Sequence, residues 1–291
     1  MKNLKIMIFT ILIMFILAFN TLCFGDNIYK GSKSEIDASN ISNGIIKIKY
    51  TSPTTKKLKV IIEKDSKKYT YDLTNTGEYD LFPLQMGDGK YKVSIYENIV
   101  DNKYSTSQSM TINVKLKDDN SPFLLPNKLV NFNANSNAIE KAKELTENKE
   151  KEIEKLDVIY DYVISNIKYD TEKAKNVKSD YLPDIDDTLA SNKGICFDYA
   201  AIMAAMLRSQ SIPTKLVTGY STNTDVFHAW NEVYIKEAGW IVLNEMYFDG
   251  NEWKLMDSTI ASSSKQSKNQ AVIEHTNKLI DKKNYTKQYE Y

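Results

Sequence analysis

The chain has 291 residues with 38 basic and 38 acidic side chains, so its formal net charge is zero. A total this close to neutral gives no sign of a nucleic-acid partner, because nucleic-acid binding domains usually present a basic surface. The length is sufficient for one large domain or two ordinary ones.

Residues 1–25 have the composition of a secretory signal. Lys2 and Lys5 precede an apolar run over residues 6–19, and small residues stand at Cys23 and Gly25. Cleavage after Gly25 would leave 36 basic and 38 acidic residues. The alternative is a retained single-pass anchor, although a membrane span needs about 20 residues. After removal of the signal we expect no stable membrane span, and a protein secreted from, or held at the surface of, a Gram-positive bacterium.

Without the signal, Cys196 is the single cysteine of the chain. An exported protein with one cysteine cannot form an internal disulfide. Its stability must then come from its hydrophobic cores. An unpaired thiol in an oxidising compartment also favours a chemical task for that residue.

Residues 26–120 alternate between apolar and polar side chains in the manner of β-strands. About seven short strands, separated by Gly, Pro and Asp turns, predict an antiparallel sandwich of immunoglobulin or fibronectin type. A spacer or docking platform is the simpler role for it, and binding to the cell wall or to a partner protein is the alternative. The clearest strands are residues 45–50, 58–63, 69–73, 90–96 and 110–116.

A linker at residues 118–122 leads into the second domain, residues 121–291, whose first segment, 122–126, is expected to be extended and to pack on that domain. Helical spacing of apolar residues predicts helices over 138–145 and 149–167.

Asp184, Asp186 and Asp187 cluster after Pro183. Clustered carboxylates can bind calcium, but this spacing does not match a hand-type loop. Asp187 and Thr188 more simply cap a short turn. We therefore predict no metal site and no cofactor.

Residues 200–207 are apolar nearly all round and predict a buried central helix. Four strands follow, and helices followed by antiparallel strands make the second domain α+β. The tail from residue 261 shows weak helical character over 271–280, and its end either docks on the domain or stays disordered. The expected strands are residues 214–220, 226–235, 240–244 and 252–256.

Cys196 stands at the first turn of the central helix. Unpaired backbone N–H groups and the helix dipole favour a thiolate there, so a nucleophile is predicted. A buried structural cysteine is the alternative.

His228 begins a strand, on the same face as Trp230, and the only other histidine is His275. Asp257 ends the strand over 252–256. If the two strands are neighbours, Asp257 can orient the imidazole of His228, and the two residues would complete a thiol triad with Cys196. Taken singly, His228 could be a core histidine and Asp257 a cap residue.

Three blocks of the sequence resemble the bacterial transglutaminase-like superfamily, a group of papain-like thiol enzymes. They are residues 194–200 (GICFDYA), 228–233 (HAWNEV) and 253–259 (WKLMDST). The flanking segments 167–170 (IKYD) and 212–220 (IPTKLVTGY) are also similar. The resemblance covers residues 136–259. It is specific for the fold and the triad but not for the reaction, since the family includes crosslinkers, peptidases, amidases and members without known activity.

The last block has Asp-Ser-Thr where Asp-Pro-Thr is more usual, and an extra strand lengthens the distance from His228 to Asp257. Asp249 is therefore an alternative third member.

The resemblance implies an acyl-enzyme on Cys196, with His228 as the base and Asp257 as the residue that orients it. The substrate would be a glutamine side-chain amide or a peptide amide, and crosslinking, deamidation and proteolysis all remain open. Tyr199 and Trp230 either line the cleft or pack in the core. A non-catalytic surface-binding protein that retains the fold is the alternative from another functional class.

Overall fold

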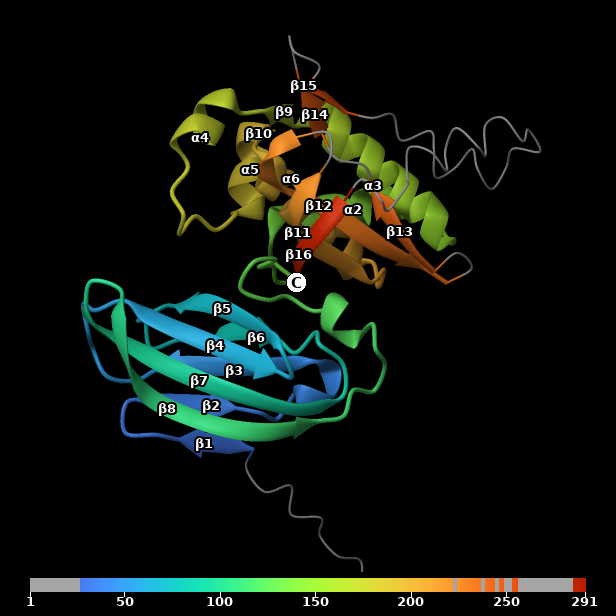
Figure 1. Cartoon of the computed structure of the whole chain (residues 1–291). Coiled ribbons are helices and arrows are strands. Elements are labelled where there is room, and N and C mark those ends of the chain that lie inside the picture. Colours follow the sequence, from blue (N-terminus) through green and yellow to red (C-terminus); the bar gives the residue numbers. More distant parts are fainter. Residues whose placement is uncertain (1–26, 222–223, 237–238, 244–245, 249–252, 256–284) are drawn as a thin grey trace, which may run out of the picture.

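The computed structural model describes residues 27–221, 224–236, 239–243, 246–248, 253–255 and 285–291 (Figure 1). The described residues form two hydrophobic cores, one beginning at Ile36 and the other at Val130. We call residues 27–117 the N-terminal unit and residues 130–291 the C-terminal unit. The predicted signal, residues 1–25, lies outside the described residues.

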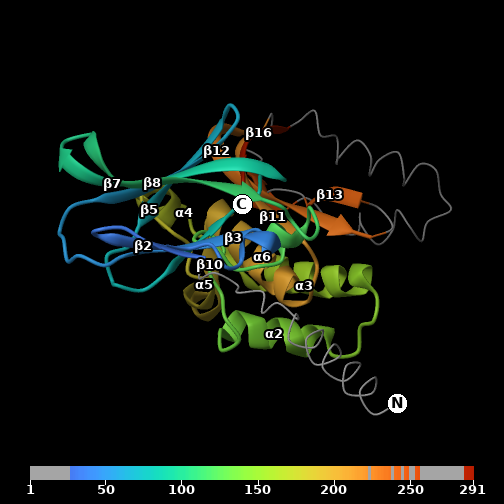
Figure 2. The same cartoon turned by 90° about the horizontal axis from the view of Figure 1, so that it is seen from below.

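The N-terminal unit consists of two antiparallel four-stranded sheets (Figures 1 and 2). The first has the order β1-β2-β3-β6, with β1 at Ile28–Lys30, β2 at Ser34–Asp37, β3 at Ile45–Tyr50 and β6 at Asp80–Pro83. The second has the order β5-β4-β7-β8, with β5 at Lys67–Leu73, β4 at Leu58–Lys64, β7 at Gly89–Val100 and β8 at Lys103–Val114. A short 3-10 turn, η1, covers Ile41–Asn43.

Side-chain alternation explains why these segments are strands. In β7, Tyr91, Val93 and Ile95 are fully buried, while Lys90 and Lys92 face solvent. Successive side chains of a strand point to opposite faces, so one face of each sheet contributes to a shared core. Four of the five clearest predicted segments lie entirely in strands, and the fifth, 110–116, extends two residues beyond the end of β8 at Val114. The immunoglobulin or fibronectin type remains a prediction.

The connection between the units differs from the extended segment that the sequence predicted. Ser121–Phe123 forms a 3-10 turn, η2, and both Pro122 and Phe123 are buried. The Phe123 ring meets the ring of Trp240 edge to face, with 5.4 Å between the ring centroids. The segment therefore packs on the C-terminal unit as expected, but the burial of Phe123 is achieved by a tight turn.

The C-terminal unit begins with helices, α2 at Asn137–Thr146 and α3 at Glu152–Asn166. Two shorter helices follow, α4 at Thr171–Asn176 and α5 at Ile185–Ser191, and then comes α6 at Cys196–Ser209. The two-residue strands β9 (Lys168–Tyr169) and β10 (Lys193–Gly194) pair in parallel. The chain is thus mixed α and β.

Four strands form the sheet of this unit in the order β13-β12-β11-β16. They are β11 at Thr214–Ser221, β12 at Thr224–Ile235, β13 at Gly239–Leu243 and β16 at Tyr285–Glu290. A separate pair joins β14 (Met246–Phe248) to β15 (Trp253–Leu255). The last described residues of the tail form β16, which pairs antiparallel with β11. Residues 271–280, predicted as weakly helical, lie outside the described part.

The cap of α5 corrects one prediction. Asp184, and not Asp187 or Thr188, caps this helix, because its carboxylate accepts hydrogen bonds from the backbone N–H groups of Asp186 and Asp187, each at 3.0 Å. Asp186 in turn accepts from the N–H of Ala138 at 2.9 Å, at the start of α2. These carboxylates therefore satisfy helix N-termini.

Helix α6 is the buried centre of the C-terminal unit, as the sequence predicted. Every residue from Asp198 to Arg208 is buried. The helix contacts α2, α3 and α5 as well as β11 and β12. Within the described residues, no helix has the length and apolar character needed to cross a membrane.

Glu97 gives the N-terminal unit a pH-dependent stability. Hydrogen bonding from Lys33, followed by that from Tyr50 and Lys56, lowers the pKa of this buried carboxyl to about 2. A depressed pKa stabilises the fold above the unfolded value of about 4.3, and this contribution is lost as the pH falls toward 2.

We expect Glu97→Gln to lower the thermal unfolding midpoint at pH 7, with the difference from wild type shrinking between about pH 4.5 and pH 2. The control is Glu63→Gln, because Glu63 pairs with Lys92 at 3.6 Å on a more exposed surface, where ion pairs contribute little. If the difference in unfolding midpoint between Glu97→Gln and wild type is as large at pH 2 as at pH 7, the pKa of Glu97 is not the cause.

Candidate functional site

Cys196 is the first residue of α6 and is half-buried. The backbone at Ile195 is extended, with φ −94° and ψ 174°, so the helix starts abruptly at the cysteine. Just upstream, Gly194 of β10 lies opposite Tyr169 of β9. The thiol therefore occupies the helix start that the sequence predicted, where backbone N–H groups precede the helical hydrogen-bond ladder.

Asp198, two residues after Cys196, fixes this helix start. Its side chain is fully buried and accepts a hydrogen bond from the backbone N–H of Ile195 at 2.8 Å. It also forms an ion pair with Lys173 at 2.8 Å and accepts a hydrogen bond from the Tyr181 hydroxyl. Burial, together with this bond, raises the pKa of Tyr181 well above its usual range. The carboxylate thus joins the turn before Cys196 to α4 and to the 177–182 loop.

His228 is on β12, opposite Gly219 of β11, and only 3% of it is exposed. Three residues later, the Asn231 side chain donates to the carbonyl of Ala200 on α6 at 2.9 Å and to that of Lys215 on β11 at 3.1 Å. Since Asn231 is buried, these bonds hold the strand of the histidine against the helix of the cysteine.

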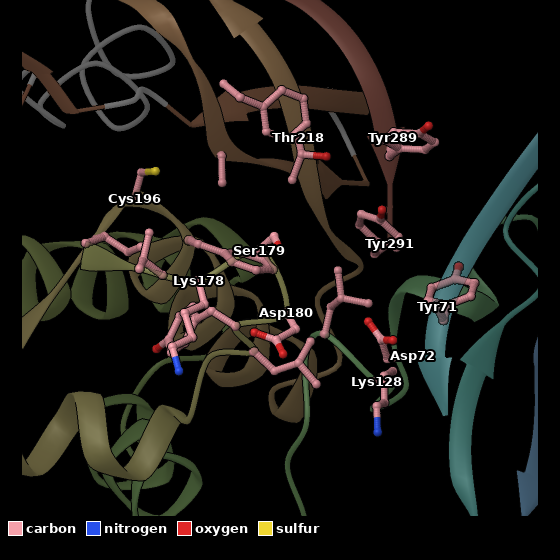
Figure 3. Close-up of a pocket in the computed structure, with 18 of the residues that line it drawn as sticks. Tyr71, Asp72, Lys128, Lys178, Ser179, Asp180, Cys196, Thr218, Tyr289 and Tyr291 are labelled. Carbon is pink, nitrogen blue, oxygen red and sulfur yellow. The ribbon is translucent and has the colours of Figure 1, made fainter. Parts of the chain in front are cut away.

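Cys196 and His228 line the same cleft, whose volume is about 400 Å³. The cleft lies between the two units, as Figure 3 shows, with Cys196 at one side of the view and Tyr71 and Asp72 of the N-terminal unit at the other. The structure thus places at one cleft two residues that are 32 positions apart in sequence.

Tyr199 and Trp230 lie elsewhere. Both are buried, and neither is among the residues that line the cleft. The Tyr199 hydroxyl donates to the carbonyl of Ile167, which ties α6 to the end of α3. Asp257 and its alternative Asp249 lie outside the described residues, so the third member of the triad stays a prediction.

Several lining residues were missed at the sequence level. Tyr71 and Asp72 come from β5 of the N-terminal unit, and Tyr289 and Tyr291 come from the end of the chain. The last segment did carry a signal, since tyrosine and threonine favour strands and recur through residues 285–291.

Gly219 allows β16 to lie this close to β11. A Cβ at this position would lie 2.2 Å from the carbonyl oxygen of Thr286, so any other residue would push the two strands apart. The register also shifts here, because Thr218 pairs with Tyr289 while Gly219 pairs with Lys287. This tight pairing places Tyr289 and Tyr291 at the cleft.

Among the described residues, no group of three or more His, Cys, Asp or Glu side chains is arranged to hold a metal ion. The cleft presents the thiol of Cys196 and the imidazole of His228.

Comparison with known proteins gives the following similarities. Residues 139–245 match the family model of the transglutaminase-like superfamily, a range that contains Cys196 and His228 and ends before Asp257. The uncharacterized protein YebA of Bacillus subtilis is 30% identical over 115 residues, which is 33% of this chain and 16% of YebA. The chain therefore spans a small part of the curated relative that it matches.

Among solved structures, a candidate cysteine protease from Cytophaga hutchinsonii is similar, with a TM-score of 0.41 and 19% sequence identity. The match covers 91% of this chain and 73% of the protease chain. Red sea bream transglutaminase is similar with a TM-score of 0.31 and 14% sequence identity, and the match covers 84% of this chain and 56% of the transglutaminase chain.

We expect Asp198→Ala to destabilise the protein by about 2–4 kcal/mol in urea unfolding, because it leaves the Ile195 N–H and the Tyr181 hydroxyl without their acceptor and removes the partner of Lys173. The control is Asp184→Ala, which removes only the cap of α5 and should cost about 1 kcal/mol. Equal losses in the two variants would mean that Asp198 is no more than a helix cap.

Proposed function

We propose that this chain, whose residues 139–245 match the transglutaminase-like family model, is an exported thiol enzyme acting on amide groups of proteins or peptides. The observation that carries this proposal is the shared cleft of Cys196 and His228, with the cysteine at the start of a buried helix. Glutamine side chains and peptide bonds both present the required carbonyl. Secretion or display at the cell surface is part of the proposal and rests on the composition of residues 1–25.

In the first half of the reaction, the Cys196 sulfur attacks the amide carbonyl carbon and forms a tetrahedral intermediate. His228 takes the thiol proton and delivers it to the amide nitrogen. The carbon–nitrogen bond then breaks, ammonia or an amine leaves, and a thioester remains on Cys196. The backbone N–H of Cys196 is the natural donor to the oxyanion because it stands at the helix start.

In the second half, a nucleophile attacks the thioester carbonyl. His228 removes its proton and the thiol of Cys196 is restored. Water as the nucleophile gives hydrolysis, whereas a primary amine gives transamidation. In this proposal Asp257 holds the imidazole in the right orientation, with Asp249 as the alternative.

The first test is the rate at which iodoacetamide alkylates Cys196 near pH 7, measured on the full chain with Cys196→Ala as the background for Cys23. We expect His228→Ala to slow the labelling by about tenfold or more, because the imidazole would no longer accept the thiol proton.

Asp257→Asn and Asp249→Asn form a matched pair in the same assay, and we expect only the former to slow the reaction. Ordinary thiol reactivity, unchanged in His228→Ala, would favour the non-catalytic surface-binding protein.

The second test separates transfer from hydrolysis. The full chain is incubated with a glutamine-containing protein and a dansylated amine, and both incorporation and ammonia release are measured. Incorporation that disappears in Cys196→Ala identifies a transferase, and release of ammonia or peptide without incorporation identifies a hydrolase. If neither product depends on Cys196, the protein does not act on these amides.

A further inference from the structure

The cleft extends well beyond the thiol, and its far wall belongs to the N-terminal unit. Thr70, Tyr71 and Asp72 of β5 line it together with Cys196 and His228. Its volume of about 400 Å³ is in the range of sites that hold a small ligand or a few side chains. The N-terminal unit therefore takes part in the site.

Exposed apolar side chains gather at this cleft. In the described part of the C-terminal unit, the large apolar residues that are exposed are Val177, Leu182, Tyr220, Phe227 and Tyr289. Four of them line the cleft, and the fifth, Tyr220, meets Phe227 edge to face at 5.4 Å. Clustered exposed apolar surface marks a place where another molecule binds.

The aromatic wall of the cleft is held in place from both units. Tyr291 meets Tyr69 at 5.6 Å and Tyr71 at 6.0 Å, and Tyr289 meets Tyr69 at 5.4 Å, in each case edge to face. Gln85 donates to the Glu290 carbonyl at 3.0 Å beside them. A wall fixed in this way loses little freedom when a ligand binds.

The charges around the cleft do not select for a charged ligand. Asp72 pairs with Lys59 at 2.6 Å, and Lys128 pairs with Asp80 at 2.8 Å. Lys178 and Asp180 contribute one charge of each sign. An uncharged apolar group therefore fits the cleft better than an ionic one.

The shape of the N-terminal wall points to an extended peptide. Consecutive residues of a strand point to opposite faces, so a cleft lined by all three of Thr70, Tyr71 and Asp72 meets the edge of β5. β5 is the outermost strand of its sheet. Such an edge can hydrogen-bond an added strand, while the cleft beside it takes a side chain of that strand.

We propose that this cleft is a subsite for a polypeptide substrate, which lies extended along the edge of β5 and places a large apolar side chain between Phe227 and Tyr289. This subsite rests on the proposed function, because the bound polypeptide would carry the amide that reacts with Cys196. It makes the N-terminal unit a specificity-determining part of the site.

The experiment measures the affinity of the full-length Cys196→Ala variant for two fluorescein-labelled decapeptides by anisotropy. Both carry a central glutamine; one has phenylalanine two residues away on each side, and its twin has serine there. We expect the phenylalanine peptide to bind at least about tenfold more tightly, since burying a large apolar side chain contributes on this scale.

The variant Thr70→Arg places a charged side chain in the cleft and should remove that preference. The matched control is Thr111→Arg, because Thr111 is an exposed threonine on β8, the opposite edge strand of the same sheet. It should retain the preference. Equal affinity of the two peptides, or equal effects of the two arginines, overturns the proposal.

Iodoacetamide labelling in the Cys196-containing chain keeps this outcome separate from the proposed reaction. The reagent is too small to need the subsite, so Thr70→Arg should leave the labelling rate unchanged. A labelling rate that falls with Thr70→Arg would also count against the subsite, because the substitution would then act on the thiol itself. If Thr70→Arg removes the peptide preference and leaves the labelling rate of Cys196 unchanged, the subsite is supported. If the labelling rate of wild type does not depend on His228, the proposed reaction fails, but the subsite does not.

Discussion

The burial of helix α6 is the constraint on which the rest of the structure depends. Because its residues 198–208 are all buried, the helix cannot shift without opening the core of the C-terminal unit. At its start, the helix carries Cys196. Near its end, the buried Arg208 donates to the main-chain oxygens of Thr214, Leu125 and Tyr291 at 2.6–2.8 Å. Burial lowers the pKa of Arg208 to about 9, so it remains charged at neutral pH and keeps these bonds.

One helix therefore connects the thiol with the junction of the two units. Arg208 links α6 to the segment after η2 and to the end of the chain, and Tyr291 in turn packs against Tyr69 and Tyr71. The cleft is a consequence of this arrangement, since it lies where α6, β16 and β5 approach one another. In this account the N-terminal unit is part of the site and not only a spacer.

Local sequence patterns were sufficient to predict many of the strands and the buried helix α6. The alternation in residues 90–96 predicted the core of β7, and the all-apolar run after Cys196 predicted a buried helix. Both signals arise within a few residues, where propensity and burial agree. The cap of α5 was misplaced because Asp184, Asp186 and Asp187 are all good caps, and only the path of the chain decides among them. β16 was missed although its tyrosine and threonine residues favour a strand, because its partner β11 is about 70 residues away in the sequence and no local pattern indicates that pairing.

The central claim is that Cys196 forms a covalent acyl intermediate with the help of His228. The most direct measurement is the mass of the full chain after brief mixing with a peptide that carries an activated glutamyl γ-ester in place of the glutamine amide, followed by an acid quench. The alcohol of this ester leaves faster than ammonia, so the thioester accumulates. The account predicts one acyl group on Cys196 in the wild type and a greatly reduced amount in His228→Ala. An unmodified Cys196, or an adduct that forms equally without His228, would contradict it.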